Sequence, residues 1–535
     1  MLKLFRAALL CAATAGLMLP PPGLAPLDAA SGAAQQQGRE PLCRRPAPLP
    51  QLPPEGEHNR AGEQVNDYGY ASPVPVEAPP APPPPPPPAP VAPPPPPPPS
   101  MEPPPIGETA APPVPIMPPP APEPTATGSE SDDSSIVLTG TRRTGRSARR
   151  PASEGRRRGG VDEPQSGQLT AGEHDDLLNP ELYARYVARS GGSLVGKGVP
   201  VLDTRRVFTV AVQDEAGRPV PFAAVTLTCA DGNTLTLETV ADGTAIFFPA
   251  VDRLGDRVRV SVAAAGRRAG EGRPVRVFGR SEAQRHRVTM AGAGRAVTRF
   301  DLFLAVDTTG SMDDELDYLK SELRAIVGAL RERHRDLDIR VGLVVYRDQG
   351  DEYVTRTFPF TGDIEQMREH LAAQSSAGGG DLPEAMDEAL ARAVAQEWRP
   401  DAVRAILLVA DAPPHDGNVP QAWAVAEAAR ARRIHIVPVA ASGVDDLAEF
   451  VMRGMAALSQ SRYLFLTDDS GIGNRHAEPA VDCYLVTRLD TLVRRVLDSL
   501  ISGRRVEPAD SEVIRSVGDY QNGRCALPND FRVED

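Results

Sequence analysis

Large apolar side chains are scarce in the first third of this 535-residue chain. Of 25 aromatic residues (13 Phe, 10 Tyr and 2 Trp), only Phe5, Tyr68 and Tyr70 precede residue 181, whereas Pro73–Pro124 holds 30 of the 58 prolines. A segment with so little apolar surface cannot offset the entropy lost on folding. We therefore expect residues 33–180 to be a disordered, Pro-rich and Arg-rich tether. The remaining residues suffice for two cored domains.

Positive charge is also in deficit. The formal net charge is −13, which argues against a general nucleic-acid binder. Lysine occurs only at Lys3, Lys197 and Lys320, against 55 arginines. We attribute that skew to the base composition of the genome, so arginine-rich surfaces are not read as functional by themselves.

The chain start has the pattern of an export signal. Lys3 and Arg6 precede the apolar run Ala7–Leu19, which prolines end. A run of 13 residues is short for a bilayer but typical of a signal-peptide core. We predict a signal peptide over 1–32 and an exported protein; the alternative is an uncleaved anchor. Export would remove Cys11 and leave Cys43, Cys229, Cys483 and Cys525. In an oxidising compartment we favour a disulfide between Cys483 and Cys525, although these four cysteines allow three pairings and free thiols are the alternative.

Two segments of the tether suggest separate roles. Pro73–Pro124 is predicted to adopt polyproline II over roughly 160 Å, as a spacer or, alternatively, as a ligand for a proline-recognising partner. Arg142–Arg158 carries eight arginines and either contacts an envelope polymer or membrane surface or is a solvated linker. The preceding Ile136–Arg142 resembles the segment near the mature start of TonB-dependent outer-membrane receptors. That resemblance implies the periplasm or cell surface of a Gram-negative bacterium.

Short alternating strands follow in residues 200–292. Val207–Val212 alternates apolar and polar residues, and turn clusters separate it from strands expected at 223–228, 245–248 and 258–263. This spacing predicts a small all-β sandwich. The phrase GRPVPFAAVTL with ADGTAIF resembles the immunoglobulin-like modules of carboxypeptidase-regulatory type, which implies a spacer or a binding module.

Residues 297–505 alternate apolar strands with amphipathic helices, ahead of a tail at 506–535. Continuously apolar runs such as Leu302–Val306, Val341–Val345 and Ile406–Ala410 predict central parallel strands, and Leu316–Leu330 has helical periodicity. The fold class is therefore α/β, a doubly wound, mostly parallel, Rossmann-like sheet.

Oxygen-bearing side chains follow the predicted strands. Asp307, Thr309 and Ser311 follow one strand, Asp411 ends another, and Asp381 ends a glycine-rich loop between them. Sites in such sheets form at strand carboxyl ends, and these oxygens suit a hard divalent cation. We predict a site for Mg²⁺, with Mn²⁺ or Ca²⁺ as alternatives. Helix capping is the competing reading for Asp307 and Ser311, and an N-cap for Asp381.

The motifs DTTGS, GGGD and ADAPPH resemble a von Willebrand factor A domain with a metal-ion-dependent adhesion site. YRDQGDEYVTRTFPFTGDIEQM and GGGDLPEA are most similar to the branch found in bacterial exported proteins and beside alpha-kinases. The resemblance implies metal binding by Asp307, Thr309 and Ser311, with Asp411 acting through water. Adhesion-type members commonly have threonine in the second loop, where this chain has Asp381.

Three functions compete at this stage. We expect a non-enzymatic module that binds a carboxylate of a protein or glycan partner through the cation. The alternative is a structural envelope scaffold without functional metal. An enzyme, a hydrolase or a kinase-associated protein, is third. His334-Arg335-Asp336-Leu337 imitates a kinase catalytic loop, but Val341 replaces the required Asn and no glycine-rich ATP loop occurs.

Overall fold

The structure is a computed structural model that describes residues 41–52, 55, 165–194, 197, 201–264, 266–270, 274–277, 284–292, 294–313, 316–380, 382–472 and 475–527. The predicted signal peptide, the proline-rich segment 73–124 and Arg142–Arg158 lie outside these residues. In the described part, no helix is both long and apolar enough to cross a membrane.

A nine-stranded sheet organises the C-terminal region. Its order is β12-β11-β10-β13-β14-β15-β1-β16-β17. The strands are β10 Arg299–Asp307, β11 Asp338–Tyr346, β12 Thr355–Thr361, β13 Val403–Ala410, β14 Ile434–Ala440, β15 Tyr463–Thr467, β1 Thr170–His174, β16 Tyr484–Arg488 and β17 Arg515–Val517. Strands β11, β10, β13, β14 and β15 run parallel, and the others pair antiparallel. The chain builds outward from β10 in both directions, which confirms the predicted doubly wound fold.

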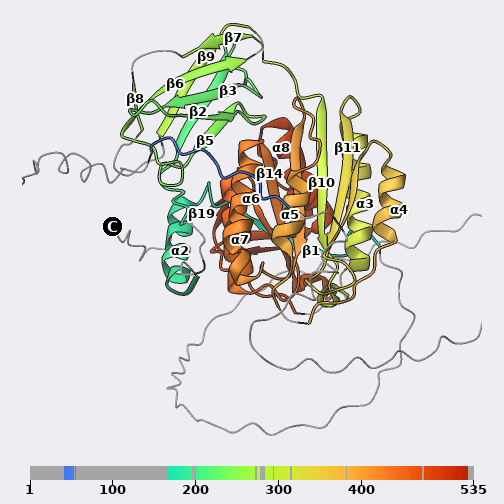
Figure 1. Cartoon of the computed structure of the whole chain (residues 1–535). Helices are drawn as coiled ribbons and strands as arrows, with labels where there is room; N and C mark the ends of the chain where they lie inside the picture. Colours follow the sequence, from blue (N-terminus) through green and yellow to red (C-terminus); the bar gives the residue numbers. More distant parts are fainter. Residues whose placement is uncertain are drawn as a thin grey trace, which may run out of the picture. The chain divides into compact units, whose positions relative to one another are not determined.

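Helices cover both faces of this sheet (Figure 1). They are α3 Leu316–Arg333, α4 Ile364–Ala372, α5 Met386–Val394, α6 Val419–Ala431, α7 Asp446–Leu458 and α8 Leu489–Ser502. Alternate residues of β10 enter two separate cores: Phe303 and Ala305 pack with α5, α6 and α7, whereas Leu302 and Leu304 pack with α3 and α8. Burial on both faces explains the continuously apolar strand sequences.

The predicted tether extends too far at its C-terminal end. Residues 170–174 form β1, which lies between β15 and β16 with antiparallel pairing to each. Helix α2, Pro180–Leu194, follows it and contributes buried Tyr183 and Tyr186 to the core. The sequence signal was weak because TAGEH lacks large apolar residues. Gly172 suits the site because a Cβ there would lie 2.6 Å from the Phe465 ring.

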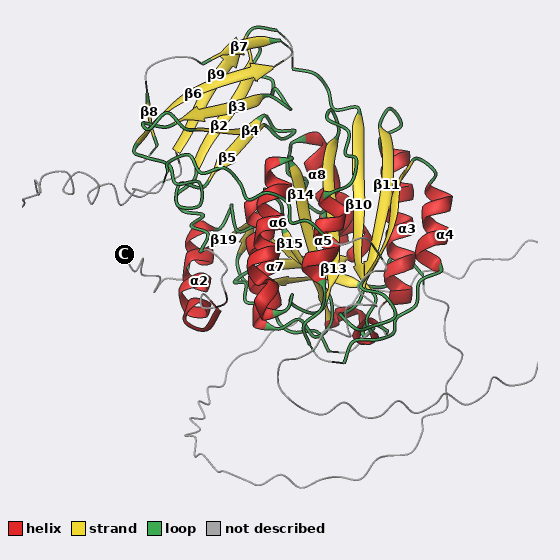
Figure 2. Cartoon of the chain, viewed as in Figure 1, coloured by secondary structure: helices red, strands yellow, loops and turns green. Residues whose placement is uncertain are grey.

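Residues 208–290 form the predicted sandwich (Figure 2). One sheet has the order β5-β2-β9 and the other β4-β3-β6-β7, with β8 pairing β6. The strands are β2 Phe208–Asp214, β3 Ala224–Thr228, β4 Thr234–Glu238, β5 Thr244–Phe247, β6 Arg257–Ala264, β7 Arg267–Ala269, β8 Val275–Arg276 and β9 Gln284–Met290. Both sheets share one core that includes Phe208, Val225 and Phe247.

Disulfides and ion pairs join the chain ends to these domains. Cys43 bonds to Cys229 of the sandwich, and Cys483 to Cys525. Arg44 also pairs with Glu427 on α6 at 2.6 Å, so residues near Cys43 contact both domains. The predicted tail, residues 506–535, contains β17 and the short strands β18 (Tyr520–Gln521) and β19 (Arg524–Cys525).

Candidate metal centre

The loop after β10 brings three predicted site residues together. Asp307 is the last residue of the strand, and its Oδ1 accepts hydrogen bonds from the Thr309 N–H at 2.9 Å and the Thr309 hydroxyl at 2.7 Å. The Thr309 hydroxyl also lies 3.1 Å from Ser311 Oγ. Asp307 and Thr309 are fully buried, whereas Ser311 is exposed. The side-chain oxygen atoms of these three residues therefore extend from the buried end of β10 to the protein surface.

The glycine-rich loop is fixed against this first loop by its backbone. Gly310 N–H donates to the Gly378 carbonyl at 3.1 Å, and Ala377 N–H donates to the Thr308 carbonyl at 3.0 Å. Gly378 has φ +80°, and a Cβ there would lie 2.4 Å from the Asp351 carboxylate. Glycine is needed at this position because the backbone conformation is left-handed and a carboxylate occupies the space of a side chain.

Asp411 completes a pair of buried acids. It directly follows β13, next to β10 in the sheet, and is 4% exposed. Burial, and then repulsion from Asp411, raise the pKa of Asp307 to about 7, although the hydrogen bonds from Thr309 oppose this rise. A hydrogen bond from the Tyr346 hydroxyl also lowers the pKa of Asp307. Its geometry is poor, because neither this hydroxyl nor Asp307 Oδ2 has a partner of ordinary hydrogen-bond geometry among the described residues. A buried acceptor left in this state costs about 1–3 kcal/mol.

Glu384 is a third buried acid that the sequence analysis missed. Its backbone N–H donates to the Pro413 carbonyl at 2.9 Å, which fixes it beside the loop after β13. Burial, followed by repulsion from Asp307, Asp348 and Asp411, raises the pKa of Glu384 to about 10. Within the described residues its Oε2 has no hydrogen-bond partner. Glu384 directly follows Pro383, and proline is typical of a helix start, so the sequence pattern predicts an N-cap at Asp381 and gives no separate signal for Glu384.

Asp348 and Asp351 belong to the same edge of the sheet. Both follow β11, so the strand-end argument used for Asp307 would have found them. Asp351 accepts from the Gly379 N–H at 2.9 Å, and Asp348 pairs with His415 at 2.6 Å. The predicted ligand Asp381 lies outside the described residues.

The donor set suits a hard cation that takes hydroxyl and water ligands. Among the described residues, no three His, Cys, Asp or Glu side chains are arranged to hold a metal by themselves. A site here would therefore combine the carboxylates of Asp307 and Asp411 with the hydroxyls of Thr309 and Ser311. Oxygen ligands that include water are typical of Mg²⁺. The buried carboxylate of Asp307 and the other acids at the carboxyl ends of these strands fit such an ion.

The kinase-like tetrapeptide has a structural position instead. His334 follows the end of α3, and its Nε2 lies 2.6 Å from Asp498 on α8. Arg333 pairs with the same carboxylate at 2.9 Å. The motif thus joins two helices.

Residues 301–474 match the family model of the von Willebrand factor type A domain. The sheet order and the matched range show that the chain contains a domain of this family. The finer predictions, of an adhesion-type metal site and of an exported branch, go beyond this match.

Two curated proteins match parts of the chain. Alpha-protein kinase vwkA of Dictyostelium discoideum is 33% identical over 123 residues, which are 23% of this chain and 20% of that protein. A putative ariadne-like RING finger protein of Acanthamoeba polyphaga mimivirus is 30% identical over 118 residues, 22% of this chain and 11% of that protein. The chain thus spans a fifth or less of the length of these relatives.

Solved structures also align with the chain. They include the conserved hypothetical protein BatB from Bacteroides thetaiotaomicron, at 17% identity and a TM-score of 0.27, over 38% of this chain and 98% of that one. An aerotolerance-related membrane protein from Bacteroides fragilis aligns at 15% identity and a TM-score of 0.26, over 38% and 98%.

Proposed function

We propose that residues 301–474 form a metal-dependent binding domain, which engages a carboxylate of a protein or glycan partner. Asp307, Thr309, Ser311 and Asp411 would hold the cation, and the hydrogen bond from the Thr309 hydroxyl orients the Asp307 carboxylate. When bound, the cation supplies an electrophilic coordination position for a carboxylate oxygen of the partner. Mg²⁺ is the proposed ion, with Mn²⁺ and Ca²⁺ as alternatives.

The observation that carries this proposal is the gathering of buried, mutually repelling acids at the carboxyl ends of β10 and β13. Asp307, Glu384 and Asp411 are all at most 4% exposed, and repulsion among them contributes to the raised pKa values of Asp307 and Glu384. Burial of carboxylates is costly unless a cation compensates them. An ion bound here would relieve the repulsion that destabilises the domain without it.

The surroundings of the domain support a role outside the cytoplasm. The N-terminal sequence pattern favours export, and the four remaining cysteines are paired in two disulfides, which oxidising compartments permit. We propose a periplasmic or cell-surface location. Glu384 is proposed to add negative charge near the ion and strengthen its retention; the role of Asp381 stays a prediction.

A structural scaffold without functional metal is the second candidate. The observation that favours it is the self-contained hydrogen bonding of Thr309 with Asp307, which by itself stabilises the loop. The two functions differ in their response to the ion, because a scaffold would gain no stability from Mg²⁺.

The direct test measures urea unfolding of the full chain in chelator and in Mg²⁺. A ligand at a hundred times its Kd stabilises a protein by about 2.7 kcal/mol. We expect wild-type protein to gain stability of this order, and Asp307→Asn and Ser311→Ala to lose most of the gain. Asp317→Asn is the matched control, because Asp317 is an exposed acid on α3. Equal Mg²⁺ responses in wild type and Asp307→Asn would reject the site.

Partner binding is tested separately by affinity capture from envelope extract. Material that binds wild-type protein should be released by chelator, restored by Mg²⁺ and absent from captures with Ser311→Ala. Capture that ignores both chelator and Ser311→Ala would favour the scaffold.

A further inference from the structure

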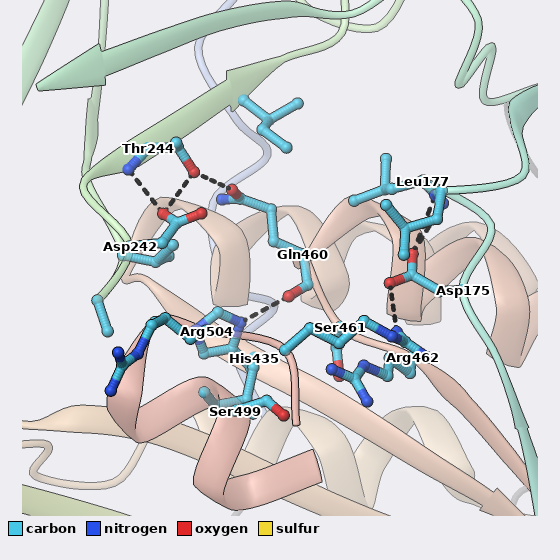
Figure 3. A pocket seen from close by; sticks show the side chains of 17 residues that line it. Asp175, Leu177, Asp242, Thr244, His435, Gln460, Ser461, Arg462, Ser499 and Arg504 are labelled. Atoms are coloured by element: carbon cyan, nitrogen blue, oxygen red, sulfur yellow. Dashed lines mark hydrogen bonds and ion pairs between the residues drawn. The ribbon is translucent and has the colours of Figure 1, made fainter. Parts of the chain in front are cut away.

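Many arginines of the α/β domain are matched by acids within the fold. In the cavity of Figure 3, for example, Asp175 and Asp242 lie in the lining together with three arginines. Arg505 pairs there with Asp175 at 3.3 Å, and Arg462 pairs with Glu173 at 2.8 Å. The high arginine content of the chain therefore does not by itself leave positive charge unmatched.

The second half of the sandwich breaks this pattern. From Arg257 to Arg295 the sequence holds ten arginines and two acids, Glu271 and Glu282. The formal charge of this stretch is 10 − 2 = +8, in a chain whose total is −13. Eight of these arginines belong to the described residues and all eight are exposed. In the described part of the chain, none of the eight forms an ion pair with an acid.

Strand pairing places four of these arginines on one face of the sandwich. On β6, Arg257 and Arg259 are exposed and alternate with buried valines. Arg276 of β8 lies directly opposite Arg257, and Arg268 of β7 lies opposite Ala263 on the same side of β6. Directly opposite residues share a face of a sheet. The four arginines therefore point outward from the β4-β3-β6-β7 sheet, and we call this surface the basic face.

Two arginines of the basic face repel each other across the sheet. Arg257 and Arg276 are paired in register, so their Cβ atoms lie about 5 Å apart. Like charges directly opposite each other destabilise a sheet. An anion that lies between the two guanidinium groups would remove this repulsion.

The acids nearest to the basic face do not cancel its charge. Glu238 lies on β4 of the same sheet, but it pairs with Arg433 of the α/β domain at 3.1 Å. Asp231 lies in the turn between β3 and β4, and the exposed Asp256 directly precedes β6. When both are counted against the four arginines, the sum is 4 − 2 = +2. The face thus remains positive.

Hydroxyl groups make up much of the remaining basic face. Thr226 and Thr228 of β3 share this face with Ser261 and Arg259 of β6, because they are paired in register. Thr226 also bonds to Thr236 of β4 at 2.8 Å. None of the residues that the pairing places on this face is aromatic, so nucleobases and sugar rings have no ring to stack on. Guanidinium and hydroxyl groups arranged in a plane suit phosphate groups that are themselves arranged in a plane.

From this arrangement we propose that the basic face binds the phosphate headgroups of an anionic lipid bilayer. Arg257 and Arg276 share a phosphate, which relieves their repulsion, and Arg259 and Arg268 extend the contact along the sheet. Each basic residue near such a surface strengthens binding about fivefold. The proposal concerns the sandwich and does not depend on the metal centre of the α/β domain.

Cosedimentation of the full chain with lipid vesicles tests this proposal. The vesicles contain either phosphatidylcholine alone or about equal parts of phosphatidylcholine and anionic phosphatidylglycerol. Chelator is present throughout, so that a divalent ion cannot bridge the metal centre to the lipid. We expect binding to the anionic vesicles alone, with a steep loss when salt is raised from about 0.05 M to about 0.5 M, because salt screens exposed charges.

Paired substitutions separate the basic face from the overall charge. Arg257→Gln combined with Arg276→Gln should weaken binding to the anionic vesicles about thirtyfold. The melting temperature of this variant should stay the same or rise, because the repulsion across the sheet is removed. Arg285→Gln combined with Arg287→Gln is the matched control. It removes the same charge from exposed positions of β9, on the outer face of the other sheet, and should weaken binding less than about threefold.

Three results would overturn the proposal. The first is the absence of binding to the anionic vesicles at low salt, and the second is equal weakening by the two double variants. The third comes from polygalacturonate, a soluble carboxylate polymer, added at the same total negative charge as the lipid. If the protein binds this polymer more tightly than the vesicles, the face recognises an anionic polymer and the assignment to lipid is wrong.

Discussion

Two groups of buried carboxylates in the same sheet differ in the charges of their neighbours. Glu173 and Asp176 form the arginine-paired group at β1, and Asp307, Glu384 and Asp411 form the acid cluster at the carboxyl ends of β10 and β13. All five are at most 4% exposed. Burial alone would raise the pKa of Glu173, but Arg462, Arg505 and Arg495 lower it to about 2. Burial and mutual repulsion raise those of Asp307 and Glu384 to about 7 and about 10.

The comparison teaches that burial does not decide the state of an acid; its partners do. Asp176 receives two bonds from the fully buried Arg453, at 2.7 and 3.0 Å, so its charge is matched inside the fold. Asp307 instead accepts hydrogen bonds from the N–H and the hydroxyl of Thr309, and neighbouring acids contribute to its raised pKa. The proposed role of the acid cluster is to bind a cation from outside, whereas the arginine-paired group is neutralised within the fold.

The largest expected effect is at Arg453. Arg453→Met leaves Asp176 and Glu449 buried without their cation, and loss of one partner of a buried pair costs about 3–5 kcal/mol. Urea unfolding of the full chain should show this loss. Lys320→Gln, which removes a surface pair with Asp317, is the control and should change stability by less than about 1 kcal/mol. A loss at Arg453 as small as the control would show that the first group needs no compensation.

An effect of intermediate size is expected when the stability of the metal-free protein is measured as a function of pH. The pKa of Asp307 is raised in the folded state, so the folded protein holds a proton that the unfolded chain releases near pH 4. Stability in chelator should therefore fall as pH rises from about 4 through about 7. Glu173 acts oppositely: its stabilisation is lost as pH falls from about 4.5 toward 2.

Unfolding midpoints at pH 5 and pH 8 check this sign. Asp307→Asn should flatten the decline between the two values, and Mg²⁺ should reduce it, because metal and protons compete for the same oxygens. A metal-free protein that is more stable at pH 8 than at pH 5 would contradict the raised pKa of Asp307.

The smallest expected effect is at Glu384. Its raised pKa means that the acid is protonated at neutral pH without metal, so Glu384→Gln replaces one neutral side chain by another. Stability in chelator should change by no more than about 1 kcal/mol, whereas the stabilisation by Mg²⁺ should decrease. Unfolding in both conditions separates the two effects. A large metal-free loss would mean that Glu384 is ionised and held by partners.

The α/β region was readable from sequence because its strands are buried on both faces. Continuous apolar runs such as Leu302–Val306 predict these strands, and the helices between them have regular amphipathic spacing. The acids that directly follow a strand, Asp307 and Asp411, could be found for the same reason. Strand β1 could not be predicted, because TAGEH is placed by pairing with β15 and β16, which are about 290 to 320 residues away in the sequence.

The remaining misses depend on contacts between distant residues. Glu384 lies beside Asp307 because its backbone bonds to Pro413, and that bond has no local sequence signal. This acid cluster could not be assembled from periodicity or spacing alone.

By itself, the sequence determined the class of each layer and the chemistry of the strand ends, because hydrophobic period and residue type are local properties. Only the tertiary structure decided which buried acids receive an arginine and which do not. That choice depends on residues hundreds of positions apart, such as Asp176 and Arg453, and charge compensation acts over distances in space rather than along the chain.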